Sequence, residues 1–153
     1  MSGEQQIHRL GAQIRSLPPQ LEALLSYWLQ KCDGRAMPIR GDLPVGELRP
    51  WIGHLALLEI VGEQDFRVRL CGTDLIRRFG REATGAVVRD LAFDIAQHLT
   101  AILKATVKAD APVVAVSHVQ LGRATYVYSE VALPLADPDG RVAMMLLGSY
   151  PVR

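Results

Sequence analysis

The chain of 153 residues is almost neutral, with 17 Lys and Arg against 16 Asp and Glu and a net charge of +1. This balance gives no overall field that would attract nucleic acid or an anionic membrane, and we expect neither as a partner. The apolar fraction of 49% is ordinary for a globular protein, and the length fits one domain plus an appendage.

Two absences set the expected compartment. No run approaches the roughly 18 apolar residues of a transmembrane helix, and the polar start at residues 1–6 lacks the apolar core of a secretory signal. Cys32 and Cys71 lie in different contexts, so we interpret them as free thiols, with a disulfide as the alternative. We therefore expect a soluble, cytoplasmic protein.

The N-terminal third, residues 1–54, predicts a helical extension and a connecting segment ahead of a core at 55–153. Apolar spacing predicts a helix over residues 4–17, which Pro18-Pro19 ends. A second predicted helix, 20–32, has an apolar face that fits its own domain, a second copy of the chain, or both. Residues 35–54 are rich in Pro and Gly and predict a connection with one helical turn near 45–48.

The core reads as strands and helices in a fixed order. Strands are predicted at 55–61 and 66–71, followed by a short helix over 74–79 that Thr73 could cap. Asp94 and Gln97 have capping-box spacing and open a longer helix that extends to 110. A strand at 113–121 follows, then a hairpin turn and its partner strand, and finally a strand at 142–150.

The hairpin turn at Gly122-Arg123 has type II′ chemistry, with glycine first, and predicts the strand register. In that register His118 faces Val127 and Val116 faces Ser129. Both faces of the predicted sheet are largely apolar, so both need a cover. The helix over 94–110 can cover one face and the helix over 20–32 the other.

This element order, and the pattern of glycine after the second strand followed by Phe79-Gly80 and Gly85, resembles a PAS domain. A bacterial PAS subfamily is similar over more of the chain. It shares a tryptophan-bearing helix, a proline-rich segment and several short motifs, seen here as Tyr27-Trp28-Leu29, Arg69-Leu70-Cys71-Gly72-Thr73, Thr84-Gly85 and Leu133-Pro134-Leu135. The resemblance implies an α+β fold with a five-stranded antiparallel sheet, short helices and one longer helix on one face, plus the N-terminal extension.

PAS domains bind small molecules between helix and sheet or pair with other domains, and usually belong to signalling proteins. The chain contains no recognisable kinase, cyclase or DNA-binding segment, so we expect a stand-alone sensory or interaction module that acts through association, as a homodimer or with a signalling partner. The alternative is a structural interaction domain with a filled core. Candidate cavity residues are Phe79, His98, Leu99, Leu103, His118 and Val127, and candidate dimer-interface residues are Leu21, Leu25, Trp28, Tyr126 and Tyr128.

Specific chemistry is weakly indicated. The reactive-cysteine motif of flavin photosensors is absent, so that photochemistry is not expected. His98 lies on the helix that supplies the axial ligand in haem-binding PAS sensors, which keeps haem open as a minority hypothesis. His118 needs a polar partner, for which we favour a backbone carbonyl or water over a ligand.

Catalysis and metal binding find little support in the sequence. Asp94 and His98 could share a metal, but no third ligand has recognisable spacing. No catalytic triad order or phosphate-binding loop appears, and we do not expect an enzyme. The arginines at 67, 69, 77, 78 and 81 are interspersed with acidic residues at 65, 74, 82 and 90, which predicts a solvated face with local ion pairs.

Overall fold

The computed structural model describes residues 8–10, 17–63, 65–79 and 81–152. Its centre is a sheet in the order β1-β4-β5-β6-β2-β3, in which the last five strands pair antiparallel. The strands are β2 (Leu55–Val61), β3 (Asp65–Cys71), β4 (Val113–Leu121), β5 (Ala124–Ala136) and β6 (Val142–Pro151), with β1 (His8–Leu10) added parallel to β4 at the edge. The predicted α+β class with a five-stranded antiparallel sheet is confirmed.

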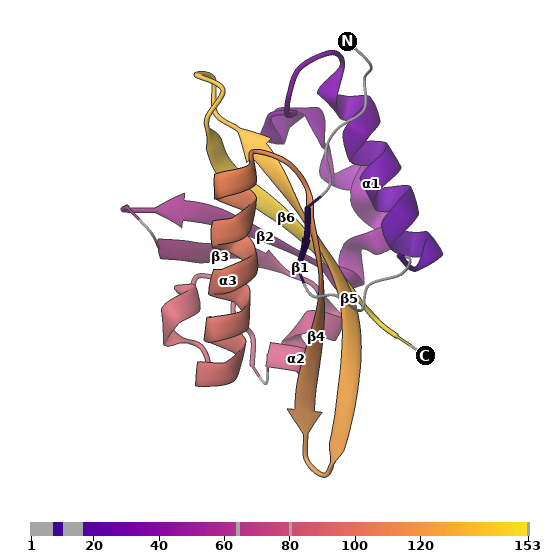
Figure 1. The fold of residues 1–153 in the computed structure, drawn as a ribbon, viewed down its shortest axis with the longest axis vertical. Helices are drawn as coiled ribbons and strands as arrows, with labels where there is room; N and C mark the ends of the chain where they lie inside the picture. Colours follow the sequence, from indigo (N-terminus) through magenta and orange to yellow (C-terminus); the bar gives the residue numbers. More distant parts are fainter. Residues whose placement is uncertain (1–7, 11–16, 64, 80, 153) are drawn as a thin grey trace.

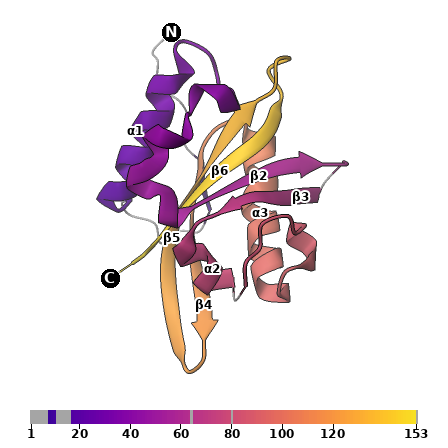
Figure 2. The same cartoon turned by 180° about the vertical axis from the view of Figure 1, so that it is seen from behind.

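Helices cover both faces of this sheet (Figures 1 and 2). The helix α3 (Phe93–Ala109) lies on one face, together with α2 (Thr73–Phe79) and the short 3-10 helix η3 (Val88–Asp90). The helix α1 (Pro19–Cys32) and the 3-10 helices η1 (Arg40–Asp42) and η2 (Val45–His54) lie on the other. The β4–β5 hairpin extends beyond the rest of the sheet in both views. No helix among the described residues is long and apolar enough to cross a membrane.

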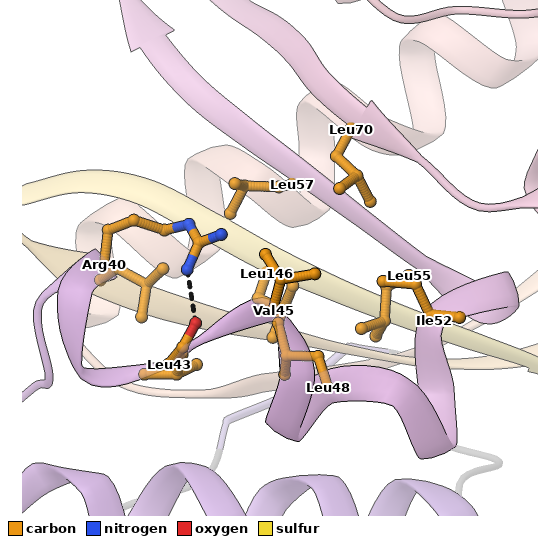
Figure 3. Close-up of a pocket in the computed structure, with 10 residues that line it drawn as sticks. Arg40, Leu43, Val45, Leu48, Ile52, Leu55, Leu57, Leu70 and Leu146 are labelled. Carbon is orange, nitrogen blue, oxygen red and sulfur yellow. Dashed lines mark hydrogen bonds between the residues drawn. The ribbon is translucent and has the colours of Figure 1, made fainter.

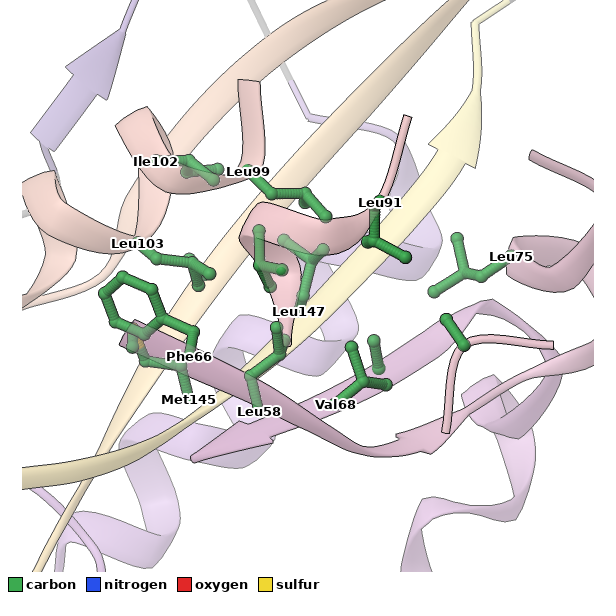
Figure 4. Close-up of a cluster of buried hydrophobic side chains, with 14 of the residues drawn as sticks. Leu58, Phe66, Val68, Leu75, Leu91, Leu99, Ile102, Leu103, Met145 and Leu147 are labelled. Carbon is green, nitrogen blue, oxygen red and sulfur yellow. The ribbon is translucent and has the colours of Figure 1, made fainter. Parts of the chain in front are cut away.

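Strand alternation divides the core into two clusters of buried side chains. Figure 4 shows the cluster under α3, in which Leu99, Ile102 and Leu103 meet Leu147 and other side chains of the sheet. The second cluster packs α1 on the opposite face, and there the indole nitrogen of Trp28 donates to the carbonyl oxygen of Pro134 at 2.8 Å. Both faces are therefore covered, as the apolar pattern predicts.

The hairpin register is as predicted, with His118 opposite Val127 and Val116 opposite Ser129. Gly122 has a φ of 64°, and Arg123 is not among the residues with positive φ. This is the asymmetry that a two-residue turn with glycine first requires. The register determines which side chains of β4 and β5 point toward α3.

The N-terminal helix expected over 4–17 is wrong where the structure describes it, because residues 8–10 form β1. The edge of β4 has unpaired backbone groups, which form hydrogen bonds with these residues. A short isolated helix, weakened by Gly11, would have to form all its hydrogen bonds within itself and is marginally stable. Residues 4–7 and 11–16 lie outside the described part, so the rest of that prediction is untested.

Two predicted helix caps are also wrong. Helix α2 begins at Thr73, and the carbonyl of Gly72 accepts from the amides of Leu75 and Ile76. Helix α3 begins at Phe93 after an extended Ala92, with no side-chain cap, so Asp94 lies inside the first turn. A carboxylate in that turn is still favourable because it faces the positive end of the helix dipole.

The apolar face of α1 belongs to the chain's own core. Leu21 and Trp28 are fully buried and Leu25 is 8% exposed, all against the sheet. A second copy cannot reach these side chains without unpacking the domain, which corrects the dimer interface expected there. Of the other two candidates, Tyr126 is 45% exposed, whereas Tyr128 is half-buried on the α3 face.

Candidate functional site

A pocket of about 410 Å³ opens on the α3 side of the sheet. It lies between the C-terminal end of α2, the first half of α3 and the outer part of the β4–β5 hairpin. Its lining combines apolar and polar residues: Arg78, Phe79, Ala92, Asp94, Ile95, His98, Ser117, His118, Val119, Gln120 and Thr125. Its volume falls within the range of about 300–1,000 Å³ that is typical of small-molecule sites.

A buried polar network adjoins this pocket, and we call it the Arg78 cluster: Arg78, His98, Ser117, Glu130 and Ser149. The Nη1 atom of Arg78 donates to Glu130 Oε2 and, at 2.5 Å, to Ser149 Oγ. Its Nη2 atom donates to Ser117 Oγ at 2.6 Å. On the other side, His98 Nε2 meets Glu130 Oε1 at 2.5 Å.

Local sequence explains why a charged side chain points inward here. Arg78 follows Leu75 by three residues on α2 and precedes Phe79, and all three are buried. Residues three and four apart share one face of a helix, so Arg78 lies on the face that packs on the sheet. Its guanidinium carbon lies 4.7 Å from the centre of the Tyr128 ring, a cation–π contact that covers one of its faces.

The acceptors of the cluster lie on three adjacent strands. Glu130 on β5 is directly opposite Ser149 on β6 and, on its other side, directly opposite Ala115 on β4. Ser117 follows two residues after Ala115 on β4 and therefore shares its face. All three point to the α3 face because strand side chains alternate. They form a polar patch in an otherwise apolar layer.

The charge of Glu130 is maintained by its neighbours. Burial raises the pKa of this carboxyl, but the positive charge of Arg78 and the hydrogen bond from His98 outweigh that effect and lower the pKa from 4.5 to about 2. Glu130 is fully buried and Arg78 is only 3% exposed, so neither charge is solvated by water. The pair is stable only as a pair, since removing one partner leaves the other charge buried alone.

One nitrogen of the cluster has no hydrogen-bond partner. The Nε atom of Arg78 is buried and has no hydrogen-bond partner. The other buried polar side-chain atom without a partner, Ser129 Oγ, is on the α1 face of β5 and does not belong to the pocket. A buried N–H without a partner is uncommon in folded proteins, and the residue that carries it lines the pocket.

The predicted cavity residues are only partly brought together. Phe79 and His98 line the pocket, and His118 lines its outer part with an exposed side chain. Leu99 and Leu103 belong instead to the closed core beneath α3 and do not line it. Val127 lies opposite His118, outside the pocket lining.

Sequence reasoning missed the central residue. The prediction of a solvated face is wrong for Arg78, which is buried and paired with Glu130. Two signals could have identified it: its spacing from Leu75 and Phe79, and the polar residues Ser117, Glu130 and Ser149 in three otherwise apolar strands. Those polar positions require a buried partner, and Arg78 supplies it.

A second hollow lies on the opposite face, beneath η1 and η2 (Figure 3). Leucines of the sheet and the exposed Val45 and Ile52 surround it, and Arg40 donates across its end to the carbonyl of Leu43. Its volume is only about 10 Å³, which is no more than one water requires. We therefore take the pocket beside the Arg78 cluster as the candidate site.

The residues of the pocket do not favour the cofactors considered above. Cys32 and Cys71 are free, neither lines the pocket, and burial raises the pKa of each thiol to about 11. His98 Nε2 already bonds Glu130, so a haem held through that atom does not fit. Among the described residues, no group of three or more His, Cys, Asp or Glu is arranged to hold a metal ion.

Comparison with solved structures finds the same fold at low sequence identity. A light-oxygen-voltage domain studied with a flavin analogue is 11% identical, with a TM-score of 0.53 over 71% of this chain and 84% of that one. An RNA-binding light-oxygen-voltage receptor is 15% identical, with a TM-score of 0.50 over 75% of this chain and 35% of that one. The PAS domain of Bordetella pertussis BvgS is 16% identical, with a TM-score of 0.44 over 71% and 84% of the two chains. The first two likenesses concern the fold alone, and the third has a TM-score too low to support an argument.

Sequence comparison identifies the family. Curated protein sequences give no match. A family model described as a PAS domain matches residues 17–150, which includes α1 and both layers around the sheet. Members of this family generally serve as sensory or interaction modules, and this chain belongs to the PAS domain family.

Proposed function

We propose that this PAS domain is a sensory module whose ligand is a small molecule bound in the pocket beside the Arg78 cluster. The observation that carries the proposal is the meeting of that pocket with a buried charged network. Elsewhere under α3, Leu99, Ile102 and Leu103 close the space between helix and sheet. The interior is thus filled at one end of α3 and hollow and polar at the other.

The polar network is difficult to explain by stability alone. Replacing a buried ion pair with apolar side chains of similar volume is often neutral or stabilising. A domain that served only as a structural interaction module would gain from closing this space with leucines, as it does one turn further along α3. A ligand that binds to the Arg78 cluster would give a functional reason for its presence.

The strand β6 offers a route from the pocket to the opposite layer. Ser149 Oγ accepts from Arg78, and the preceding residue, Gly148, lies against α1. The contact is so close that a Cβ atom at 148 would lie 2.7 Å from a methyl group of Leu24. A ligand that shifts Arg78 would therefore bias the packing of α1 through adjacent residues of one strand.

A second candidate function is protein association without a ligand. The observation in its favour is the pair of exposed apolar side chains Val45 and Ile52, at 51% and 37% exposure, beside the outer hollow. A homodimer or a signalling partner could cover them, together with the exposed Tyr126 on the hairpin. The two functions are compatible, since association can be the output of sensing.

A pocket-filling variant tests the ligand proposal. Val119 lines the pocket from β4, so Val119→Trp would occupy it, whereas Val116→Trp places the same bulk in the same strand on the opposite face. We expect compounds from a fragment library to raise the melting temperature of wild type and Val116→Trp but not of Val119→Trp. Equal responses in all three proteins, or no response in wild type, would contradict the proposal.

A further inference from the structure

We propose that the ligand is a small organic carboxylate with an apolar body, and that its carboxylate pairs with Arg78 while His98 takes up a proton. This inference rests on the proposed function, because it names the chemical class that the same pocket would accept. It follows from the donors, the walls and the charges of the site.

The hydrogen-bond inventory of Arg78 leaves donors without an acceptor. Nη1 serves Glu130 and Ser149, Nη2 serves Ser117, and Nε has no partner. An unpaired buried N–H destabilises the fold, and a ligand oxygen that accepts from it would remove this penalty. The Nε edge of a guanidinium is one of the two edges that bind carboxylates in bidentate fashion.

The two serines add to the excess of donors. Ser117 and Ser149 each accept a bond from Arg78, so each retains its own hydroxyl hydrogen to donate. The acceptor atoms of Glu130 are already engaged by Arg78 and His98. A ligand with a hydrogen-bond acceptor would therefore have donors to bind beside the cluster. A cationic ligand would have only the carboxylate of Asp94 in the pocket lining, and that side chain is exposed.

The walls define the rest of the ligand. Phe79, Ile95 and Val119 supply apolar surface to the same pocket. Such a combination of a few polar groups in an apolar concavity selects a molecule with one polar end and an apolar body. An aliphatic or aromatic acid meets this description, and an unsubstituted inorganic anion does not.

Charge balance brings in His98. With a neutral His98, as the proposal requires, Arg78 and Glu130 neutralise one another in the empty site, and an arriving carboxylate would leave one uncompensated negative charge in a water-poor environment. Because His98 Nε2 faces a carboxylate oxygen, this nitrogen carries the hydrogen and Nδ1 is the atom free to accept a proton. A proton from solvent at Nδ1 restores neutrality.

The surroundings of His98 bear on this proton. Glu130 from β5 contacts it, and Asp94, one turn earlier on α3, lines the same pocket. Both are negatively charged when ionised. Arg78 from α2 is the positively charged neighbour, and His118 from β4 is the other titratable group of the pocket. The added carboxylate of the ligand then tips the balance toward the protonated ring.

Calorimetric titration with matched compounds tests the inference. The probes are phenylacetate, 3-phenylpropionate and hexanoate, each with its amide, and the amine 2-phenylethylamine, measured in phosphate and in Tris. We expect at least one acid to bind roughly tenfold more tightly than its amide. Its heat of binding should differ between the buffers by the amount for uptake of about one proton.

His98→Gln provides the matched control, because glutamine retains a donor for Glu130 but cannot take up a proton. Its melting temperature verifies that it is folded. In this variant the acids should bind about tenfold more weakly and the buffer dependence should vanish. Acid binding that is unchanged in His98→Gln, or that takes up no proton in wild type, would overturn the inference.

The remaining outcomes separate this inference from the proposed function. Amides or the amine binding as tightly as the acids, with binding lost in Val119→Trp, would overturn the carboxylate inference and leave the pocket as a small-molecule site. If neither these probes nor the fragment library binds wild type, both the inference and the proposed function fail.

Discussion

At the scale of single residues, Glu130 and Arg78 form a pair in which each charge depends on the other. Glu130→Gln preserves the shape of the side chain but leaves the guanidinium of Arg78 buried without a counter-charge. We expect this variant to lose about 3–5 kcal/mol of unfolding free energy, measured by urea denaturation.

The double variant Arg78→Met/Glu130→Leu is the matched control for this prediction. It removes both charges and supplies apolar side chains of similar size, so it should recover most of the stability lost in Glu130→Gln. A single variant that costs less than about 1 kcal/mol, or a double variant no more stable than the single, would show that the pair is not the buried unit described here.

Glu130 also makes the stability of the fold depend on pH. Because the folded-state pKa of Glu130 is lowered from 4.5 to about 2, its contribution to stability is fully present above about pH 4.5. It is lost as the pH falls toward 2, and the lowered pKa corresponds to about 3 kcal/mol. Unfolding free energies measured between pH 5 and 2 should fall less steeply in Glu130→Gln than in wild type, whereas parallel curves would contradict the assignment.

At the scale of elements, Gly72 determines how β3 leads into α2. A Cβ atom at this position would lie 2.4 Å from the carbonyl oxygens of both Ile52 and Gly53 in η2. Backbone atoms cannot yield as side-chain ends do, so Gly72→Ala must separate η2 from the start of the helix that carries Arg78. We expect a loss of about 3 kcal/mol or more in chemical denaturation.

Gly46→Ala in η2 serves as the control, because a Cβ there would meet nothing within 4 Å. Its stability should stay within about 1 kcal/mol of wild type. Equal effects at the two positions would indicate a general loss of backbone freedom rather than a close approach at Gly72.

Element positions were largely predictable because they rest on local signals. Residues 55–61 and 113–121 are strands with the predicted bounds, and the chemistry of Gly122 determined the hairpin register. The surface covered by α1 was not predictable in this way. An apolar stripe shows that a helix packs on something, but not whether the partner is its own sheet, as for Trp28, or a second copy.

At the scale of the whole molecule, the site arises from segments far apart in the chain. Arg78 and Glu130 are separated by 52 positions, and the pocket draws on α2, α3, β4 and β5. The sequence identified Phe79, His98 and His118 as lining residues because they belong to elements that the family resemblance places near the cavity. Composition does not identify Arg78, because it does not distinguish a buried arginine from its exposed neighbour Arg77; only the spacing from Leu75 and Phe79 and the polar positions in the strands do so.

Backbone-amide NMR during titration of wild type with the best-binding compound of the fragment screen is the most direct test of the pocket. We expect the largest shifts in the segments 92–98 and 117–120, which contribute lining residues to the pocket, with smaller shifts at Ser149 and in α1. Shifts centred on the outer hollow at residues 43–57, with the pocket residues unchanged, would contradict binding in this pocket.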